Sequence, residues 1–245
     1  MNTQCQRYPP LVDLTEILHE NETRDSIIIP ADPMYEGCSI NRVFCTKFLG
    51  LYMDDTLSWD IHINTLVEKL APTIGVLYRL NTVFNDIAKR CLYFGLIHSK
   101  LSYMIPIWGA ATRSRLEILC VLQRRAIKHL FGFPRLYPSD LLFQEVQLLT
   151  LENLHKYSCI ILVHQVIKGL NWCNTDFVSN TTVCNYGTRL KNKLHIPKCN
   201  TTKYGIRSVY NILVKFYNEI PQNIILATNI NIFKRKLKKY IISPN

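Results

Sequence analysis

The chain has 245 residues, and its 29 lysines and arginines against 18 aspartates and glutamates give a formal net charge of +11 at pH 7. A hydrophobic content of 48% excludes an intrinsically disordered chain, and no uninterrupted apolar run reaches the length of a membrane span. The excess of positive charge favours a polyanionic partner such as nucleic acid, although basic ribosomal and membrane-surface proteins share it.

The first ten residues lack the basic-then-apolar layout of a signal peptide, so we expect an intracellular protein, nuclear or cytoplasmic, with no membrane contact. The 9 cysteines are scattered along the chain without any C-x-x-C pair. An odd number in this arrangement predicts buried free thiols rather than a disulfide framework or a zinc site.

Residues 1 to about 40 are polar and interrupted by prolines, with an edge strand expected at Ile27–Ile29, immediately before Pro30. Gly37 is expected to turn the chain into a small β-hairpin that reaches about Leu51. A short strand over 43–53 then leads into the first helix.

Tyr52-Met53-Asp54-Asp55 spells a sequence that reverse transcriptases carry at a hairpin tip, where the carboxylates hold two Mg²⁺ ions. Adjacent strand residues point to opposite faces, so the pair would supply one good ligand, and no upstream carboxylate lies in a strand-like setting. Apolar residues recur at helical spacing soon afterwards, from Ile63 to Leu77. We therefore expect Asp54 and Asp55 to lie between a strand and a helix, as turn formers and N-terminal partners.

Hydrophobic periodicity and capping residues predict seven helices, at about 58–80, 86–101, 115–131, 139–147, 150–168, 206–219 and 229–242. Pro72 is expected to kink or split the first. Asn85 is expected to cap the second, and Ser114 with Glu117 to form a capping box at the third. Gly132 is expected to end the third helix in a left-handed conformation.

Each helix is expected to bury an apolar face. For the second helix this face is Ile87, Cys91, Leu92, Phe94 and Ile97. For the third helix it is Leu116, Leu119, Gln123, Ala126, Ile127 and Leu130. The fifth helix, 150–168, is apolar nearly all round and should be central to a bundle. Residues 170–205 are polar and predict a long loop with little structure of its own.

Two basic clusters are candidate nucleic-acid-binding sites. Arg124, Arg125 and Lys128 lie on the flank of the third helix, where a solvated face is the alternative. The last helix carries Lys234, Arg235, Lys236, Lys238 and Lys239. For this tract a phosphate-binding face, a nuclear-import sequence and a merely solubilising surface stay open, because all three need only clustered positive charge.

The string KFLGLYMDDTLSWDIHI, Lys47 to Ile63, resembles the F-L-G-x-x-x-D-x-x-L-x-W-x-x-H-I signature of non-LTR (LINE-class, jockey-like) retrotransposon reverse transcriptases. Shorter similarities follow at Tyr103–Gly109, Leu122–Ala126, Tyr217–Pro221 and Phe233–Lys238. In that family the signature lies after the catalytic box, where the last palm strand enters the thumb. The resemblance therefore makes the Tyr-Met-Asp-Asp spelling a coincidence and implies that Phe48, Leu49 and Gly50 position a primer end.

The same string also contains Trp59 and His62, near the start of the first helix, and their expected roles do not depend on the resemblance. Trp59 is expected to be a core anchor, and His62 to bond a backbone carbonyl.

The resemblance implies a mainly α fold, in which a thumb-like helical bundle follows a small N-terminal β-hairpin that is a remnant of a palm. The expected segments are a palm remnant (1–57), a helical bundle (58–170), a polar loop or linker (171–205) and a helical segment with a basic tail (206–245). The chain would be a C-terminal fragment of an RNA-directed DNA polymerase that binds an RNA–DNA hybrid or duplex.

No catalytic residue, metal ion or cofactor is expected in the chain itself, because the palm aspartates that hold Mg²⁺ in the parent enzyme are absent. The alternative from another class is a degenerate element relic that acts as a helical protein-interaction module without catalysis. A compact active polymerase using Asp54 and Asp55 is the third reading.

Overall fold

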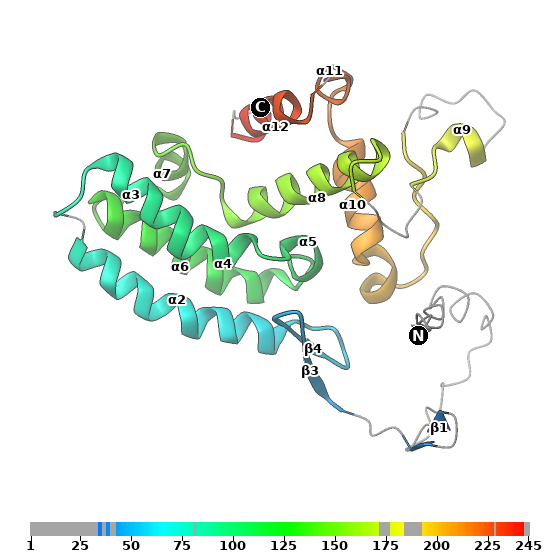
Figure 1. Ribbon diagram of the computed structural model, residues 1–245, viewed down its shortest axis with the longest axis horizontal. Helices are drawn as coiled ribbons and strands as arrows, with labels where there is room; N and C mark the ends of the chain where they lie inside the picture. Colours follow the sequence, from blue (N-terminus) through cyan, green and yellow to red (C-terminus); the bar gives the residue numbers. More distant parts are fainter. Residues whose placement is uncertain are drawn as a thin grey trace, which may run out of the picture. The chain divides into compact units, whose positions relative to one another are not determined.

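The computed structural model describes residues 34–35, 38–39, 43–80, 82–171, 177–183, 193–227 and 229–242. They fall into two units that divide between Phe44 and Cys45. In the first unit, β1 (Met34–Tyr35) and β2 (Cys38–Ser39) pair antiparallel. The edge strand expected at Ile27–Ile29 lies outside the described residues. The second unit contains every predicted site residue and is mainly helical, which confirms the predicted fold class (Figure 1).

The second unit begins with a tight antiparallel hairpin. β3 (Cys45–Phe48) pairs with β4 (Leu51–Asp54), with Phe48 opposite Leu51. Leu49 and Gly50 form the turn with φ values of 47° and 86°. Two successive positive φ angles are typical of the two-residue turns that match strand twist. The single strand expected over 43–53 is therefore wrong, but Asp54 does lie between a strand and a helix, as predicted.

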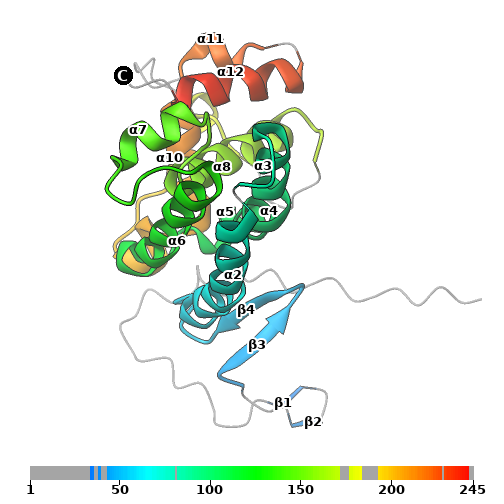
Figure 2. The same ribbon diagram turned by 90° about the vertical axis from the view of Figure 1, so that its left-hand side faces the viewer.

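Two long helices, α2 (Asp60–Leu80) and α6 (Arg113–Phe131), lie side by side (Figures 1 and 2). α2 continues through Pro72 without interruption, so the split that the proline suggested does not occur. The other helical elements are α3 (Asp86–Tyr93), the π-helix η1 (Phe94–His98), α4 (Ser99–Ser102), α5 (Ile105–Trp108), α7 (Ser139–Glu145), α8 (Leu151–Ile167), α9 (Asn180–Val183), the π-helix η2 (Thr202–Ile206), α10 (Val209–Asn218), α11 (Gln222–Ile225) and α12 (Ile230–Ile242).

The helix α8 joins two hydrophobic clusters. Its first turn contributes Leu151 and Leu154 to a cluster formed with α2, α3, α5 and α6. Its second half contributes Cys159, Ile160 and Val163 to a cluster formed with α10, α11 and α12. The all-round apolar pattern thus reflects burial on two sides, and the predicted central position of this helix is confirmed.

The helix ends follow most of the predicted caps. The Asn85 side chain accepts a hydrogen bond from the Ala88 amide at 2.9 Å, and Gly132 ends α6 with φ 76°. The capping box at Ser114 is wrong, because α6 already begins at Arg113 and its N-cap residue, Thr112, makes no side-chain cap bond. Ser114 therefore lies inside the first turn, where its hydroxyl is not placed to cap.

The buried face of the second predicted helix differs from expectation. Ile97 is fully buried, as predicted. Ile87 is 75% exposed, however, and Cys91 and Phe94 are also exposed, whereas Tyr93 and Leu101, which were not in the predicted face, are fully buried. The helix passes into the π-helix η1 at Phe94. A π turn holds more residues than an α turn, so it can rotate only the residues that follow it, such as Leu101. Ile87, Cys91 and Tyr93 precede the π turn, and their exposure depends on how α3 packs on α6.

The segment predicted as a structureless loop, 170–205, contains α9, an isolated bridge between Ser179 and Leu194, and most of η2. Its end is tied to α10, because the Asn218 side chain accepts from the Leu194 amide and donates to the Leu194 carbonyl, each at 2.9 Å. The predicted segment boundaries after 57, 170 and 205 stay predictions.

Other expectations concern membranes, thiols and metals. In the part of the chain that the structure describes, no helix combines the length and apolarity of a membrane span. Cys45, Cys91, Cys120, Cys159 and Cys199 are free thiols, as predicted for unpaired cysteines, although only Cys159 is fully buried. Across the same described ranges, no group of histidine, cysteine and acidic side chains could hold a metal ion.

Candidate nucleic-acid interface

The Asp54 carboxylate organises the loop before α2. It accepts hydrogen bonds from the Thr56 hydroxyl at 2.5 Å, the Ser58 amide at 3.0 Å and the Trp59 amide at 3.1 Å. Partial burial alone would raise the pKa of Asp54, but these hydrogen bonds outweigh it and hold the pKa far below the usual range. A side-chain cap of this kind contributes about 0.5–2 kcal/mol, so Asp54 has a structural task here.

Phe48, Leu49 and Gly50, predicted to meet a primer end, form the exposed tip of the β3–β4 hairpin. Phe48 is 60% exposed and Leu49 is 64% exposed. The Tyr103 hydroxyl donates to the Leu49 carbonyl at 2.5 Å, and a side chain at Gly50 would contact the Tyr103 ring. Tyr103 therefore fixes the hairpin turn against the helical bundle, while the tip of the hairpin is exposed to solvent.

Arg124, Arg125 and Lys128 lie together in one groove of about 700 Å³. The groove also contains three side chains from elsewhere in the chain, namely Tyr78 of α2 and Phe133 and Arg135 of the segment after α6. Four permanent cations thus surround a concavity whose other walls include aromatic rings. Clustered permanent cations of this kind are the groups with which proteins hold a phosphate backbone.

Two of these cations have protein partners on the rim. Arg124 pairs with Glu117 at 2.5 Å, and Lys128 donates to the Arg135 carbonyl at 2.8 Å. Both side chains are partly exposed, so these contacts contribute little to stability and are exchangeable. Burial, and secondarily the charge of Arg125, lowers the pKa of His129, which therefore adds a neutral ring to the groove at pH 7.

Sequence reasoning missed Tyr78, Phe133 and Arg135. The signal for the last two was Gly132, because a left-handed C-cap reverses the chain over the last helical turn. The Phe133 amide accordingly bonds the Lys128 carbonyl at 2.9 Å, and Arg135 returns beside Lys128. Tyr78 carried no such signal. Only the packing of α2 on α6 brings its ring to a centroid distance of 5.0 Å from the His129 ring.

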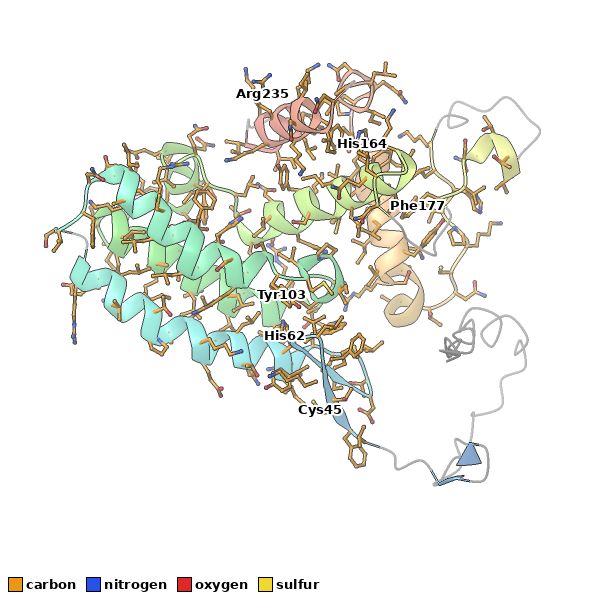
Figure 3. The ribbon with its side chains drawn as sticks, in the orientation of Figure 1. Cys45, His62, Tyr103, His164, Phe177 and Arg235 are labelled. Atoms are coloured by element: carbon orange, nitrogen blue, oxygen red, sulfur yellow. The ribbon has the colours of Figure 1, made fainter. Side chains whose placement is uncertain are left out.

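The basic tract of α12 does not form one face. Phe233 and Leu237 are fully buried, and Arg235, Lys236 and Lys239 are exposed, while Lys234 is partly buried. Lys238 is also partly buried, and this burial, and then the charge of Arg90, lowers its pKa. None of the five α12 cations lines the groove of α6, so the two predicted clusters are separate surfaces. Figure 3 shows Arg235 on the outer side of α12.

The two residues expected to be structural near the start of α2 are both buried. Trp59 is 7% exposed and belongs to the core, as predicted. His62 is 4% exposed, but the backbone carbonyl expected as its partner is absent: within the described chain both ring nitrogens lack a hydrogen-bond partner. Burial, and then the charge of Lys69, lowers the pKa of His62, so the imidazole is neutral at pH 7.

No protein-family model matches this chain, and no solved structure matches it. The chain is similar to a probable RNA-directed DNA polymerase from transposon BS of Drosophila melanogaster, with 26% identity over 122 residues. The aligned part covers 48% of this chain and 13% of that protein. This similarity supports a relationship to transposon reverse transcriptases. The jockey-like subclass and the thumb assignment stay predictions.

Proposed function

We propose that this chain is a nucleic-acid-binding piece of a non-LTR retrotransposon reverse transcriptase, corresponding to its thumb and downstream region. It binds the phosphate backbone of an RNA–DNA hybrid or duplex through the groove of α6 and does not itself polymerise DNA. The proposed polymerase origin is supported by the similarity to the transposon BS protein and by the signature from Lys47 to Ile63.

The observation that carries the proposal is the groove itself. Arg124, Arg125, Lys128 and Arg135 converge from a helix and the segment that follows it, and α6 packs on the core through a stripe of which all residues but Leu116 are buried. Cations on a packed helix lose little entropy on meeting a phosphate, whereas cations on an unfolded tail lose more. Phosphate contacts without base contacts predict binding with little sequence preference.

The salt dependence of binding tests the groove. Replacing Arg124, Arg125 and Lys128 together by alanine is expected to flatten the slope of log K against log salt concentration by about two to three units, because each phosphate contact on a duplex contributes about 0.9. The measurement is fluorescence anisotropy with a labelled RNA–DNA hybrid over a range of salt concentrations. The melting temperature should change little, because exposed charges contribute little to stability.

A matched control removes three cations outside the groove: Arg113, Lys168 and Lys215, all exposed. This triple alanine variant has the same net charge as the groove variant and is expected to retain most of the slope. Equal slopes for the two variants would show that only net charge matters and would contradict the groove as the binding site. A separate alanine variant of Lys234, Arg235, Lys236 and Lys239 measures the contribution of α12.

Catalysis is tested by primer extension. With Mg²⁺, primer–template and nucleotides, the protein is expected to give no extension, because three local donors already occupy the Asp54 carboxylate. Asp54→Asn and Asp55→Asn should behave like the parent protein. Extension that is lost in either variant would establish the reading in which these aspartates hold the metal ions of an active polymerase.

The competing function, a helical protein-interaction module, is favoured by one surface feature. A largely apolar hollow of about 580 Å³ lies between the loop before α2 and the start of α10, where Leu57, Trp59, Ile107 and Val209 form part of the wall. If that function holds, the parent protein itself, like both triple variants, should bind the hybrid only weakly and with a shallow salt slope. The hybrid titration therefore separates the two functions.

A further inference from the structure

A second cationic hollow shares no lining residue with the groove of α6 in the described part of the chain. It has a volume of about 330 Å³ and lies between the hairpin turn, α2 and α4. Its polar and charged lining consists of His62, Thr65, Lys69, Ser99, Lys100 and Tyr103. Figure 3 shows His62 and Tyr103 close to the junction of the hairpin with the bundle. Among the described residues no carboxylate lines the hollow, so its two ammonium groups are not neutralised by that lining.

Some hydrogen-bond donors in this hollow already have an acceptor in the protein, and others do not. The hydroxyls of Thr65, Ser99 and Tyr103 donate to backbone carbonyls. Lys100 donates to the Lys69 carbonyl and to the Thr73 hydroxyl, each at 3.2 Å, which leaves one of its three N–H groups. For the Lys69 ammonium, no hydrogen bond or ion pair exists among the described residues.

His62 is the second, independent indication of a ligand. It is 96% buried, lines the hollow, and has no partner on either ring nitrogen within the described chain. The Trp108 ring, at a centroid distance of 5.7 Å, covers one side of the imidazole. A buried polar group without a partner costs free energy, and a ligand that accepts its N–H removes that cost.

We propose that this hollow binds a phosphate monoester, either at the end of a nucleic-acid strand or on a free nucleotide. The dianionic group would accept hydrogen bonds from Lys69, Lys100 and His62, which together offer two positive charges and one neutral N–H. A monoester matches these two charges, whereas an internal phosphodiester carries only one. The proposal does not depend on the α6 groove, because the two sites share no residue.

Oligonucleotides that differ only in a 5′-phosphate test the proposal. The phosphorylated single strand is expected to bind about tenfold or more tightly than its 5′-hydroxyl counterpart, the gain typical of charge-assisted hydrogen bonds. Lys69→Met should abolish this difference. Lys215→Met, which removes another exposed lysine outside the hollow, should preserve it. A difference that Lys69→Met leaves unchanged would overturn the proposal.

Inorganic phosphate and a nucleoside monophosphate separate the two sources of the ligand. Each is added to the full chain while the ring resonances of His62 are followed by NMR. If the site takes any phosphate group, both compounds are expected to shift the His62 resonances, and the Lys69→Met variant should lose these shifts. A response to the phosphorylated strand alone would restrict the site to strand ends, and no response to any of the three would exclude the site. The groove variant should retain the preference for the 5′-phosphorylated strand, so this site can be tested even if the groove proposal is wrong.

Discussion

Trp108→Ala is expected to lower the free energy of unfolding by about 3–5 kcal/mol, the range for deleting a large buried aromatic side chain. Trp108 belongs to the first hydrophobic cluster and is the largest fully buried side chain among the described residues. Its indole N–H donates to the Tyr103 carbonyl at 2.8 Å, so the variant also leaves that carbonyl without its donor. Equilibrium denaturation with urea measures the change.

Two controls separate packing from hydrogen bonding. Trp108→Phe retains part of the ring but no donor, and it is expected to cost less than the alanine variant. Leu226→Ala removes a large apolar side chain that is 75% exposed, and it should stay within about 0.5 kcal/mol of the parent. A Trp108→Ala variant as stable as Leu226→Ala would contradict the position of Trp108 in the core.

Trp108 also supports the hairpin turn and the phosphate hollow through Tyr103. It holds Tyr103 through the backbone, and the Tyr103 hydroxyl holds the Leu49 carbonyl at the hairpin turn. Tyr103 also lines the phosphate hollow. Loss of Trp108 should therefore loosen the hairpin before it affects the groove of α6, which Trp108 does not line.

Acidification from pH 6.5 to pH 4 is expected to destabilise the protein by an amount on the order of 3 kcal/mol through His155 alone. Burial lowers the pKa of His155 to about 4, although a hydrogen bond to the Pro106 carbonyl opposes the shift. The folded state thus excludes a proton that the unfolded state binds near pH 6.5. The contribution of His155 is fully present above pH 6.5 and is lost as the pH falls toward 4.

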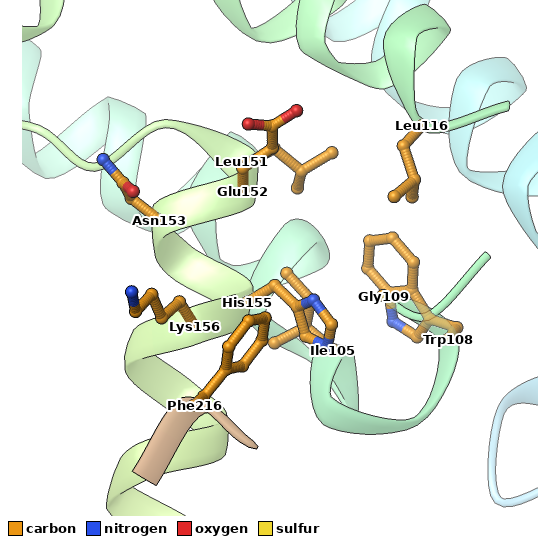
Figure 4. Close-up of a pocket in the computed structure, with 10 residues that line it drawn as sticks. All are labelled: Ile105, Trp108, Gly109, Leu116, Leu151, Glu152, Asn153, His155, Lys156 and Phe216. Atoms are coloured by element: carbon orange, nitrogen blue, oxygen red, sulfur yellow. The ribbon is translucent and has the colours of Figure 1, made fainter. Parts of the chain in front are cut away.

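The surroundings of His155 explain why its charged form is excluded. The imidazole lies in a hollow of about 310 Å³ with Ile105, Trp108 and Phe216 around it (Figure 4). Phe216 meets the ring edge to face at a centroid distance of 5.5 Å, and Nε2 has no partner within the described residues. A side chain at Gly109 would collide with the imidazole at 2.6 Å, so glycine is needed there to admit the ring.

Unfolding free energies of the parent and of His155→Gln, measured between pH 7.5 and pH 4.5, test this account. Glutamine has no titratable group in this range, so the variant should lose stability less steeply than the parent as the pH falls. Part of the slope should persist, because burial also lowers the pKa of His62, His98, His129 and His164. Parallel pH profiles for the two proteins would show that His155 does not carry the acid sensitivity.

Local sequence patterns were sufficient to predict most helices and several of their ends. Asn85 and Gly132 act as caps because capping depends on a side chain or a φ angle within one turn of the helix. The buried stripe of α6 followed from spacing alone, since Leu119, Ala126 and Leu130 recur at helical intervals and are all fully buried. The structural position of Asp54 followed from the helix that begins just after it.

Only the tertiary structure decided which residues meet across elements. The groove forms because the chain reverses at Gly132 and brings Arg135 beside Lys128, and because the packing of α2 on α6 brings Tyr78 against His129. Hydrophobic periodicity in the sequence predicts neither contact. The packing of α3 on α6 buried Tyr93, whose hydroxyl accepts a hydrogen bond from Gln123 on the neighbouring helix. Sequence periodicity determines a face within one element, whereas a site depends on the packing of several elements.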